Sequence, residues 1–199
     1  HNKKVNFNKE QQQVFNGLYE LLKKDEFDKA LLFGVTGSGK TAVYLSLCEK
    51  CLECSKNAII MVPEISLTPQ LLNIFYNRFG DMVAIFHSGL SMGERFDEWK
   101  RVNEKKARIA IGTRSAVFAP MDNIGLIVID EEQESSYKSD MTPRFNARDA
   151  AEFRARYNNA LLLLASATPS ITTFAKAKSG QFKLFKLDKR YGNSILPDV

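Results

Sequence analysis

A glycine-rich loop between an apolar segment and the start of a helix places the strongest constraint on this chain. Residues 30–43 read ALLFGVTGSGKTAV, which fits the pattern G-x-x-x-x-G-K-[ST]. In that pattern backbone N–H groups close around a phosphate, Lys40 reaches the terminal phosphates and Thr41 holds magnesium, while the helix N-terminus adds partial positive charge. A plain glycine- and serine-rich turn is the alternative, but the flanking strand and helix favour a nucleoside triphosphate site. The loop residues expected to bind it are Gly34, Thr36, Gly37, Ser38, Gly39, Lys40 and Thr41.

The composition is that of an ordinary globular domain, with 199 residues, 44% hydrophobic and 26% charged. No apolar run approaches the roughly 20 residues that span a bilayer, and the N-terminus lacks the apolar core of a signal peptide. We therefore expect a cytoplasmic protein without a membrane partner. Because the chain starts with His1 and ends in SILPDV, we also expect a single domain taken from a longer protein. The net charge of +5 permits nucleic-acid binding without demonstrating it.

Three cysteines, Cys48, Cys51 and Cys54, follow the glycine-rich loop at a spacing of three residues. No fourth cysteine or histidine lies nearby, so we interpret them as thiols along one side of a helix, with a metal site as the alternative. A reducing compartment makes a disulfide improbable.

The rest of the chain alternates between short apolar runs and segments with helical spacing. Five apolar runs read as strands, at residues 58–62, 83–86, 108–112, 125–130 and 161–165. Three segments read as helices, at residues 7–24, 66–79 and 91–105. Asn8 is the expected N-cap of the first helix, and Gly80 is expected to end the second. The alternation predicts an α/β fold, with a mostly parallel central sheet, helices on both faces and ligands at the carboxyl ends of the strands.

An acidic run follows one of these predicted strands. Asp130 ends the apolar run 125–130, at the place where phosphate-hydrolysing sites hold their magnesium, and Glu131 stands beside it. A carboxylate next to the metal can orient or deprotonate the attacking water, so we assign Asp130 to the metal and Glu131 to the water. A solvated acidic loop is the alternative. The preceding strand and the upstream loop favour the catalytic interpretation.

A second polar segment, Ser166 to Ser170, also follows an apolar run. Its small hydroxyl side chains are expected at the same edge of the sheet as Asp130, where they can connect neighbouring sites. The alternative is a simple helix cap, with Ser170 capping a helix through Phe174.

The order of the motifs resembles that of the superfamily 2 DNA helicases. In chain order they are GVTGSGKT (34–41), VPEISLTPQ (62–70), HSGLS (87–91), GTRSAVFAP (112–120), DEEQ (130–133) and SATPS (166–170). The second and fourth of these, with SSYK and PRF-x-ARD between 135 and 149, are similar to the PriA family of primosomal replication-restart helicases. The resemblance covers residues 7–199 and implies the first of two RecA-like P-loop motor lobes.

The resemblance implies further residue roles. Gln11 would contact adenine, although a lone glutamine on a helix is also typical of solvated surface. Gln133, Ser166, Ala167 and Thr168 would couple ATP hydrolysis to DNA. This family usually has histidine where Gln133 stands, and glutamine cannot gain a charge, which leaves the strength of that coupling open.

The segment 133–148 mixes aromatic residues with cations, a composition that suits stacked bases and phosphates. It resembles the aromatic-rich loop with which such helicases sense single-stranded DNA, and GTR at 112–114 resembles a motif that grips the DNA backbone. Aromatics packed on the core with solvated cations are the alternative. The residues expected to contact DNA are Thr113, Arg114, Tyr137, Lys138, Arg144, Phe145 and Arg148.

No segment after Ser170 resembles the second motor lobe, its arginine finger or the zinc-binding cysteine cluster of the family. We therefore expect a lobe that uses ATP and Mg²⁺ and is nearly inactive alone, with zinc elsewhere in the full-length protein. The implied function is unwinding or remodelling of single-stranded and branched DNA at stalled forks, with primosome and single-strand-binding proteins as partners. The alternatives are a superfamily 2 translocase on RNA or duplex DNA, and a nucleotide-dependent switch that binds proteins.

Overall fold

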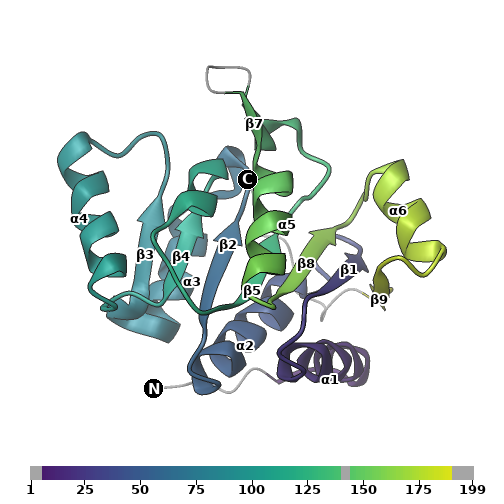
Figure 1. The fold of residues 1–199 in the computed structure, drawn as a ribbon. Helices are drawn as coiled ribbons and strands as arrows, with labels where there is room; N and C mark the ends of the chain where they lie inside the picture. Colours follow the sequence, from purple (N-terminus) through teal and green to yellow (C-terminus); the bar gives the residue numbers. More distant parts are fainter. Residues whose placement is uncertain (1–5, 140–143, 190–199) are drawn as a thin grey trace, which may run out of the picture.

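The central feature of the fold is a parallel sheet. The computed structural model of the chain describes residues 6–139 and 144–189. Within these ranges seven strands pair in parallel in the order β3-β4-β2-β5-β8-β1-β9 (Figure 1). They are β1 (Asp28–Gly34), β2 (Asn57–Met61), β3 (Val83–Phe86), β4 (Ile109–Gly112), β5 (Ile124–Ile129), β8 (Leu161–Ser166) and β9 (Lys183–Leu187). The predicted mostly parallel sheet is confirmed.

Helices cover both faces of this sheet. One face packs on α1 (Lys9–Lys23), α2 (Lys40–Glu53) and α3 (Pro69–Phe79), and the other on α4 (Met92–Asn103), α5 (Ala147–Tyr157) and α6 (Ile171–Lys178). Figure 1 shows α5 crossing in front of the central strands. Neighbouring residues such as Ile59 and Ile60 serve opposite faces, which explains why the strands read as continuous apolar runs. No helix in the described ranges is long and apolar enough to cross a bilayer.

Local sequence signals fix most element boundaries. Asn8 closes a capping box at the start of α1, as expected, and Ser170 caps α6, which was the alternative considered for it. Ser91 closes a second capping box, at the start of α4, which was not predicted. The helix expected from residue 66 begins instead at Pro69. A short 3-10 turn, η1 (Glu64–Ser66), precedes it and Thr68 caps it, because proline fits the first helical position and disfavours a helical residue before it.

Several elements were not predicted. They include helix α5, strand β9 and a small antiparallel pair of strands, β6 (Lys138–Ser139) and β7 (Phe145–Asn146). They also include three 3-10 turns: η2 (Gly80–Met82), η3 (Arg114–Phe118) and η4 (Ser135–Tyr137). Helix α5 lacks a stripe of large apolar residues because alanines, Ala147, Ala151 and Ala155, form its buried face. The four-residue spacing of these alanines, together with the N-cap Asn146, is the sequence signal that could have indicated this helix.

The strand order places the functional loops next to one another. Strand β8 lies between β5 and β1, with Ser166 opposite Phe33 and Leu164 opposite Ile129. The carboxyl ends of these three strands therefore meet at one edge of the sheet, where the glycine-rich loop, the acidic run and the Ser166 segment follow them.

Candidate functional site

The glycine-rich loop has the open geometry that a phosphate group requires. Gly37 and Gly39 have φ angles of 77° and 87°, a left-handed region that favours glycine. Gly39 is also the N-cap of α2 and offers no side chain to the first-turn amides. The hydroxyl of Ser38 is buried without a hydrogen-bond partner among the described residues. Uncapped amides and an unpaired buried hydroxyl fit an anionic ligand at this helix N-terminus.

Lys40 lies folded over the loop. Its ammonium group is largely buried and donates to the carbonyl of Gly34 at 2.6 Å. Burial lowers the pKa of Lys40, and the charges of Asp130 and Glu131 partly oppose this shift. A lysine held by carbonyl oxygens is positioned to exchange them for phosphate oxygens.

Gln11 contacts the same loop. Its side chain is 1% exposed, donates through Nε2 to the carbonyl of Ser38 at 2.8 Å and accepts through Oε1 from the amide of Asn8 at 3.0 Å. The solvated-surface alternative for Gln11 is therefore wrong. The structure places this residue beside the nucleotide loop, and the adenine contact stays a prediction.

Asp130 stands at the end of β5, opposite this loop. Its carboxylate accepts from the Tyr44 hydroxyl and from the Glu131 amide, both at 3.0 Å. Burial raises the pKa of Asp130, the Tyr44 hydrogen bond opposes that shift and Glu131 adds to it. The Tyr44 hydroxyl also interacts with the side chain of Thr41, so the two expected magnesium ligands lie around one phenol. Their hydroxyl and carboxylate oxygens fit the chemistry that magnesium prefers. Tyr44 itself was not predicted.

The expected coupling residues form a continuous hydrogen-bond chain. Glu131, whose φ is 47°, accepts from Gln133 Nε2 at 2.9 Å. Gln133 Oε1 accepts from the Ser166 hydroxyl at 2.6 Å, and that hydroxyl accepts from the amide of Thr168 at 2.9 Å. Both ends of the Gln133 amide are used, so glutamine bridges the carboxylate and the hydroxyl without a charge. Ala167 is half-buried between the last two residues.

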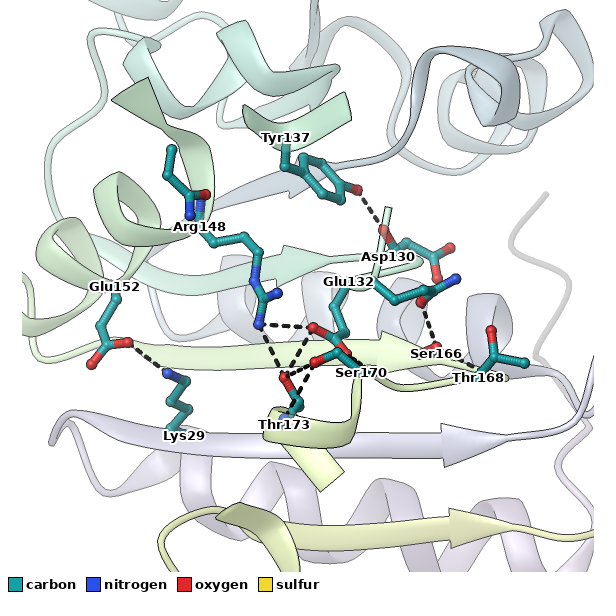
Figure 2. Close-up of polar contacts among 12 residues, drawn as sticks. Lys29, Asp130, Glu132, Tyr137, Arg148, Glu152, Ser166, Thr168, Ser170 and Thr173 are labelled. Carbon is teal, nitrogen blue, oxygen red and sulfur yellow. Dashed lines mark hydrogen bonds and ion pairs between the residues drawn. The ribbon is translucent and has the colours of Figure 1, made fainter. Parts of the chain in front are cut away.

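Sequence reasoning gave Glu132 no role, yet it is fully buried and anchors a polar cluster (Figure 2). Its carboxylate pairs with Arg148 at 2.8 Å. It also accepts from the amide of Ser170 at 2.7 Å and from the hydroxyl of Thr173 at 3.0 Å. The cluster therefore joins the acidic turn after β5 to the starts of α5 and α6. An acidic residue beside Asp130 and Glu131, the two predicted catalytic carboxylates, carries no separate sequence signal.

Three residues expected to contact DNA are buried or paired within the protein, and for them DNA contact stays a prediction that this geometry disfavours. Tyr137 is 1% exposed, so its ring is not available for base stacking. Arg148 is engaged with Glu132, and Thr113 is buried. A run of aromatic and cationic residues does not determine which of its side chains face the solvent, because tertiary contacts decide which of them turn inward. Residues 140–143 of this loop lie outside the described residues.

Other predicted DNA contacts do reach the surface. Lys138 and Arg144 are exposed, and Arg114 is half-buried with one guanidinium nitrogen donating to the carbonyl of Lys138 at 2.8 Å. Phe145 is half-buried and packs edge-on against Phe118, with ring centroids 4.9 Å apart. Phe118 is 58% exposed and was not among the predicted contacts. For Lys138, Arg144, Arg114 and Phe145, DNA contact stays a prediction.

Several known proteins are similar in sequence to this chain. The family model described as type III restriction enzyme, res subunit, matches residues 4–171. The chain is 48% identical over 190 residues to the replication restart protein PriA of Bacillus subtilis, covering 96% of this chain and 24% of that protein. The corresponding protein of Chlamydia trachomatis is 43% identical over 94% of this chain and 25% of its own length. The chain thus spans about a quarter of these curated relatives.

Solved structures show the same fold. RecG bound to a three-way DNA junction aligns with a TM-score of 0.70 at 19% identity, over 96% of this chain and 25% of that one. The Hef helicase domain of Pyrococcus furiosus aligns with a TM-score of 0.63 at 17% identity, over 91% and 38%. The chain therefore shares the fold of these RecA-like domains, a parallel sheet with helices on both faces.

Proposed function

The chain belongs to the family described as type III restriction enzyme, res subunit, and on this premise we propose that it is the first ATP-binding motor lobe of a replication-restart DNA helicase. The whole protein would couple ATP hydrolysis to unwinding or remodelling of single-stranded and branched DNA at stalled forks. The observation that carries the proposal is the hydrogen-bond chain from Glu131 through Gln133 and Ser166 to Thr168. It links the hydrolytic carboxylates to the neighbouring strand end, as a motor requires. The similarity to PriA proteins supports the restart role.

Each residue of the site has a physical task in this proposal. The first-turn amides of α2 and Lys40 would bind the phosphates, and Thr41 with Asp130 would hold magnesium. When bound, the ion neutralises charge on the phosphates. Glu131 accepts the proton of the attacking water, while Gln133 fixes the orientation of its carboxylate.

The remaining parts of the activity would come from the rest of a longer protein. Because the relatives are about four times as long as the matched region, we propose that a second motor lobe with an arginine finger, a zinc-binding segment and DNA-binding domains lie elsewhere in it. Primosome and single-strand-binding proteins are the proposed partners, and the cytoplasm is the proposed compartment.

The proposal is tested by the polymer that stimulates ATP turnover of the full-length natural protein. Steady-state rates are measured with a branched DNA fork, single-stranded DNA, duplex DNA, RNA and no polymer, with Lys40→Ala as the control for contaminating ATPase. We expect the largest stimulation with the fork or single-stranded DNA. Stimulation by RNA or by duplex DNA alone indicates a different translocase, and turnover that no polymer stimulates indicates a nucleotide-dependent switch.

A further inference from the structure

Two side chains of the 133–148 loop, Tyr137 and Arg148, bind the acidic turn 130–133 from opposite sides. From the first flank, the Tyr137 hydroxyl donates to the carbonyl oxygen of Asp130 (Figure 2). It also lies 3.2 Å from the carbonyl oxygen of Met61. Met61 ends β2 and pairs with Ile129 at the end of β5. The phenol therefore fixes the backbone at the point where β5 gives way to the magnesium-holding residue.

From the second flank, Arg148 holds the other side of the same turn. Its guanidinium donates to Glu132 at 2.8 Å and to the Thr173 hydroxyl at 3.0 Å. That hydroxyl donates to Glu132 and accepts from Arg148 and Ser170, so its one donor and both acceptor sites are used. Glu132 in turn binds through its amide to the carbonyl of Ala165 at 3.1 Å. The Thr173 hydroxyl at the centre of the cluster therefore has no spare hydrogen-bonding position.

The position of this cluster argues for a role in the site rather than in stability alone. An ion pair whose carboxylate is fully buried loses solvation, which offsets much of its attraction, so it is weak evidence for stabilisation. Glu132 stands between Glu131 and Gln133, and Asp130 precedes them. Because Glu132 is anchored by these contacts, it fixes the backbone between Glu131 and Gln133, the proposed water-activating and coupling residues.

We propose that Tyr137 and Arg148 are positioning residues that hold the 130–133 turn in its magnesium-binding geometry, and that neither acts by contacting DNA. The inference rests on the proposed function, because it assigns the support of that same site. Residues that orient the ligands of a metal are expected to change its affinity by about 10- to 100-fold when they are removed. The burial of Tyr137 and the pairing of Arg148 supply that support from two directions.

The test uses Tyr137→Phe, Arg148→Gln and Arg148→Lys in the full-length protein. Binding of a fluorescent ADP analogue is titrated with magnesium, ATP turnover is measured in parallel, and affinity for a single-stranded oligonucleotide is measured separately. We expect Tyr137→Phe and Arg148→Gln to raise the half-saturating magnesium concentration about 10-fold or more and to lower kcat. The oligonucleotide Kd should stay at its wild-type value. Arg148→Lys should recover part of the magnesium affinity, because it restores a cation opposite Glu132.

Arg78→Gln is the matched control, because Arg78 pairs with Glu49 at 2.7 Å between α3 and α2, away from the acidic turn. It should leave the magnesium dependence at its wild-type value. If Arg148→Gln does not fold, Tyr137→Phe still decides the matter, since it keeps the ring and removes only the hydroxyl. Wild-type magnesium dependence of Tyr137→Phe, or a loss of oligonucleotide affinity instead, overturns the inference. A Lys40→Ala protein that turns over ATP at the wild-type rate overturns the proposed function, a separate failure.

Discussion

The glycine-rich loop and the 133–148 loop lie at the same edge of the sheet but present their polar groups in opposite ways. In the first, uncapped amides and the unpaired Ser38 hydroxyl await a ligand. In the second, the hydroxyl of Tyr137 and the guanidinium of Arg148 are already satisfied by the protein. One loop is built to receive a ligand, and much of the other is built to support the turn beside it.

The difference follows from what each sequence pattern encodes. A glycine-rich loop acts through its backbone, and glycine spacing determines that backbone locally, so the pattern predicts the site. A run of aromatics and cations acts through side chains, and a side chain can turn toward solvent or toward the core. For Tyr137 the core offers two carbonyl acceptors and burial of a large ring, which outweighs exposure.

The largest expected effect concerns the arginine finger that a second lobe would bring to the glycine-rich loop. Residues 1–199 alone should bind ATP weakly with magnesium and hydrolyse it about 10³- to 10⁵-fold more slowly than the full-length protein, because an arginine finger from a second lobe is worth that factor. DNA should not stimulate the fragment, since it has no lobe to close against. Turnover of purified fragment and full-length protein is compared with Lys40→Ala versions of both. A fragment as fast as the whole protein would mean a self-sufficient NTPase.

The next effect tests the glycine-rich loop itself. Lys40→Ala in the full-length protein should lower kcat by about 10²- to 10³-fold, the usual loss when one preorganised donor to a developing charge is removed. Lys50→Ala on the same helix, where the lysine pairs with Glu53 at the surface, is the matched control and should be neutral. Both should melt within a degree or so of wild type without nucleotide. Normal turnover by folded Lys40→Ala protein is incompatible with the assignment.

The sequence predicted most of the architecture but less of the site's surroundings. Continuous apolar strands and helix caps such as Asn8 and Ser170 act locally, so their positions were correct. Helix α5 was missed because its buried face is alanine, which is too small to give a hydrophobic period. The roles of Tyr44 and Glu132 depend on partners 86 and 41 residues away in Asp130 and Thr173, and no local pattern reports such contacts.

A smaller effect separates the exposed residues of the 133–148 loop from its buried ones. If Lys138 and Arg144 contact phosphates, each change to alanine should lower the slope of log K against log salt by about one and weaken DNA binding about threefold at moderate salt. The affinity for an oligonucleotide is measured across a salt series. Tyr137→Phe is the contrasting variant and should leave the slope at its wild-type value. An unchanged slope for Lys138→Ala and Arg144→Ala would mean that the whole loop is structural.

The smallest effect concerns an ion pair, away from the site, between β1 and α5, the elements next to the two loops. Lys29 near the start of β1, the strand that leads into the glycine-rich loop, pairs at 2.5 Å with Glu152 of α5, the helix that follows the other loop. Burial raises the pKa of Glu152, but hydrogen bonds from Lys29 and Arg156 outweigh it and hold the pKa below its ordinary value. A depressed carboxyl pKa stabilises the fold above the unfolded value of 4.5, and this stability is lost as the pH falls through the folded value.

Glu152→Gln should therefore lower the free energy of unfolding by up to about 1 kcal/mol at pH 7, and the difference from wild type should shrink as the pH falls below 4.5. Urea unfolding at several pH values measures it, with Glu26→Gln at an exposed position as the control that should show no change. A difference that persists in acid would assign the loss to packing instead of charge. Because the pair lies outside the site, the magnesium dependence of nucleotide binding should stay the same. If it also changed, the two loops would be coupled through β1 and α5 as well as through the acidic turn.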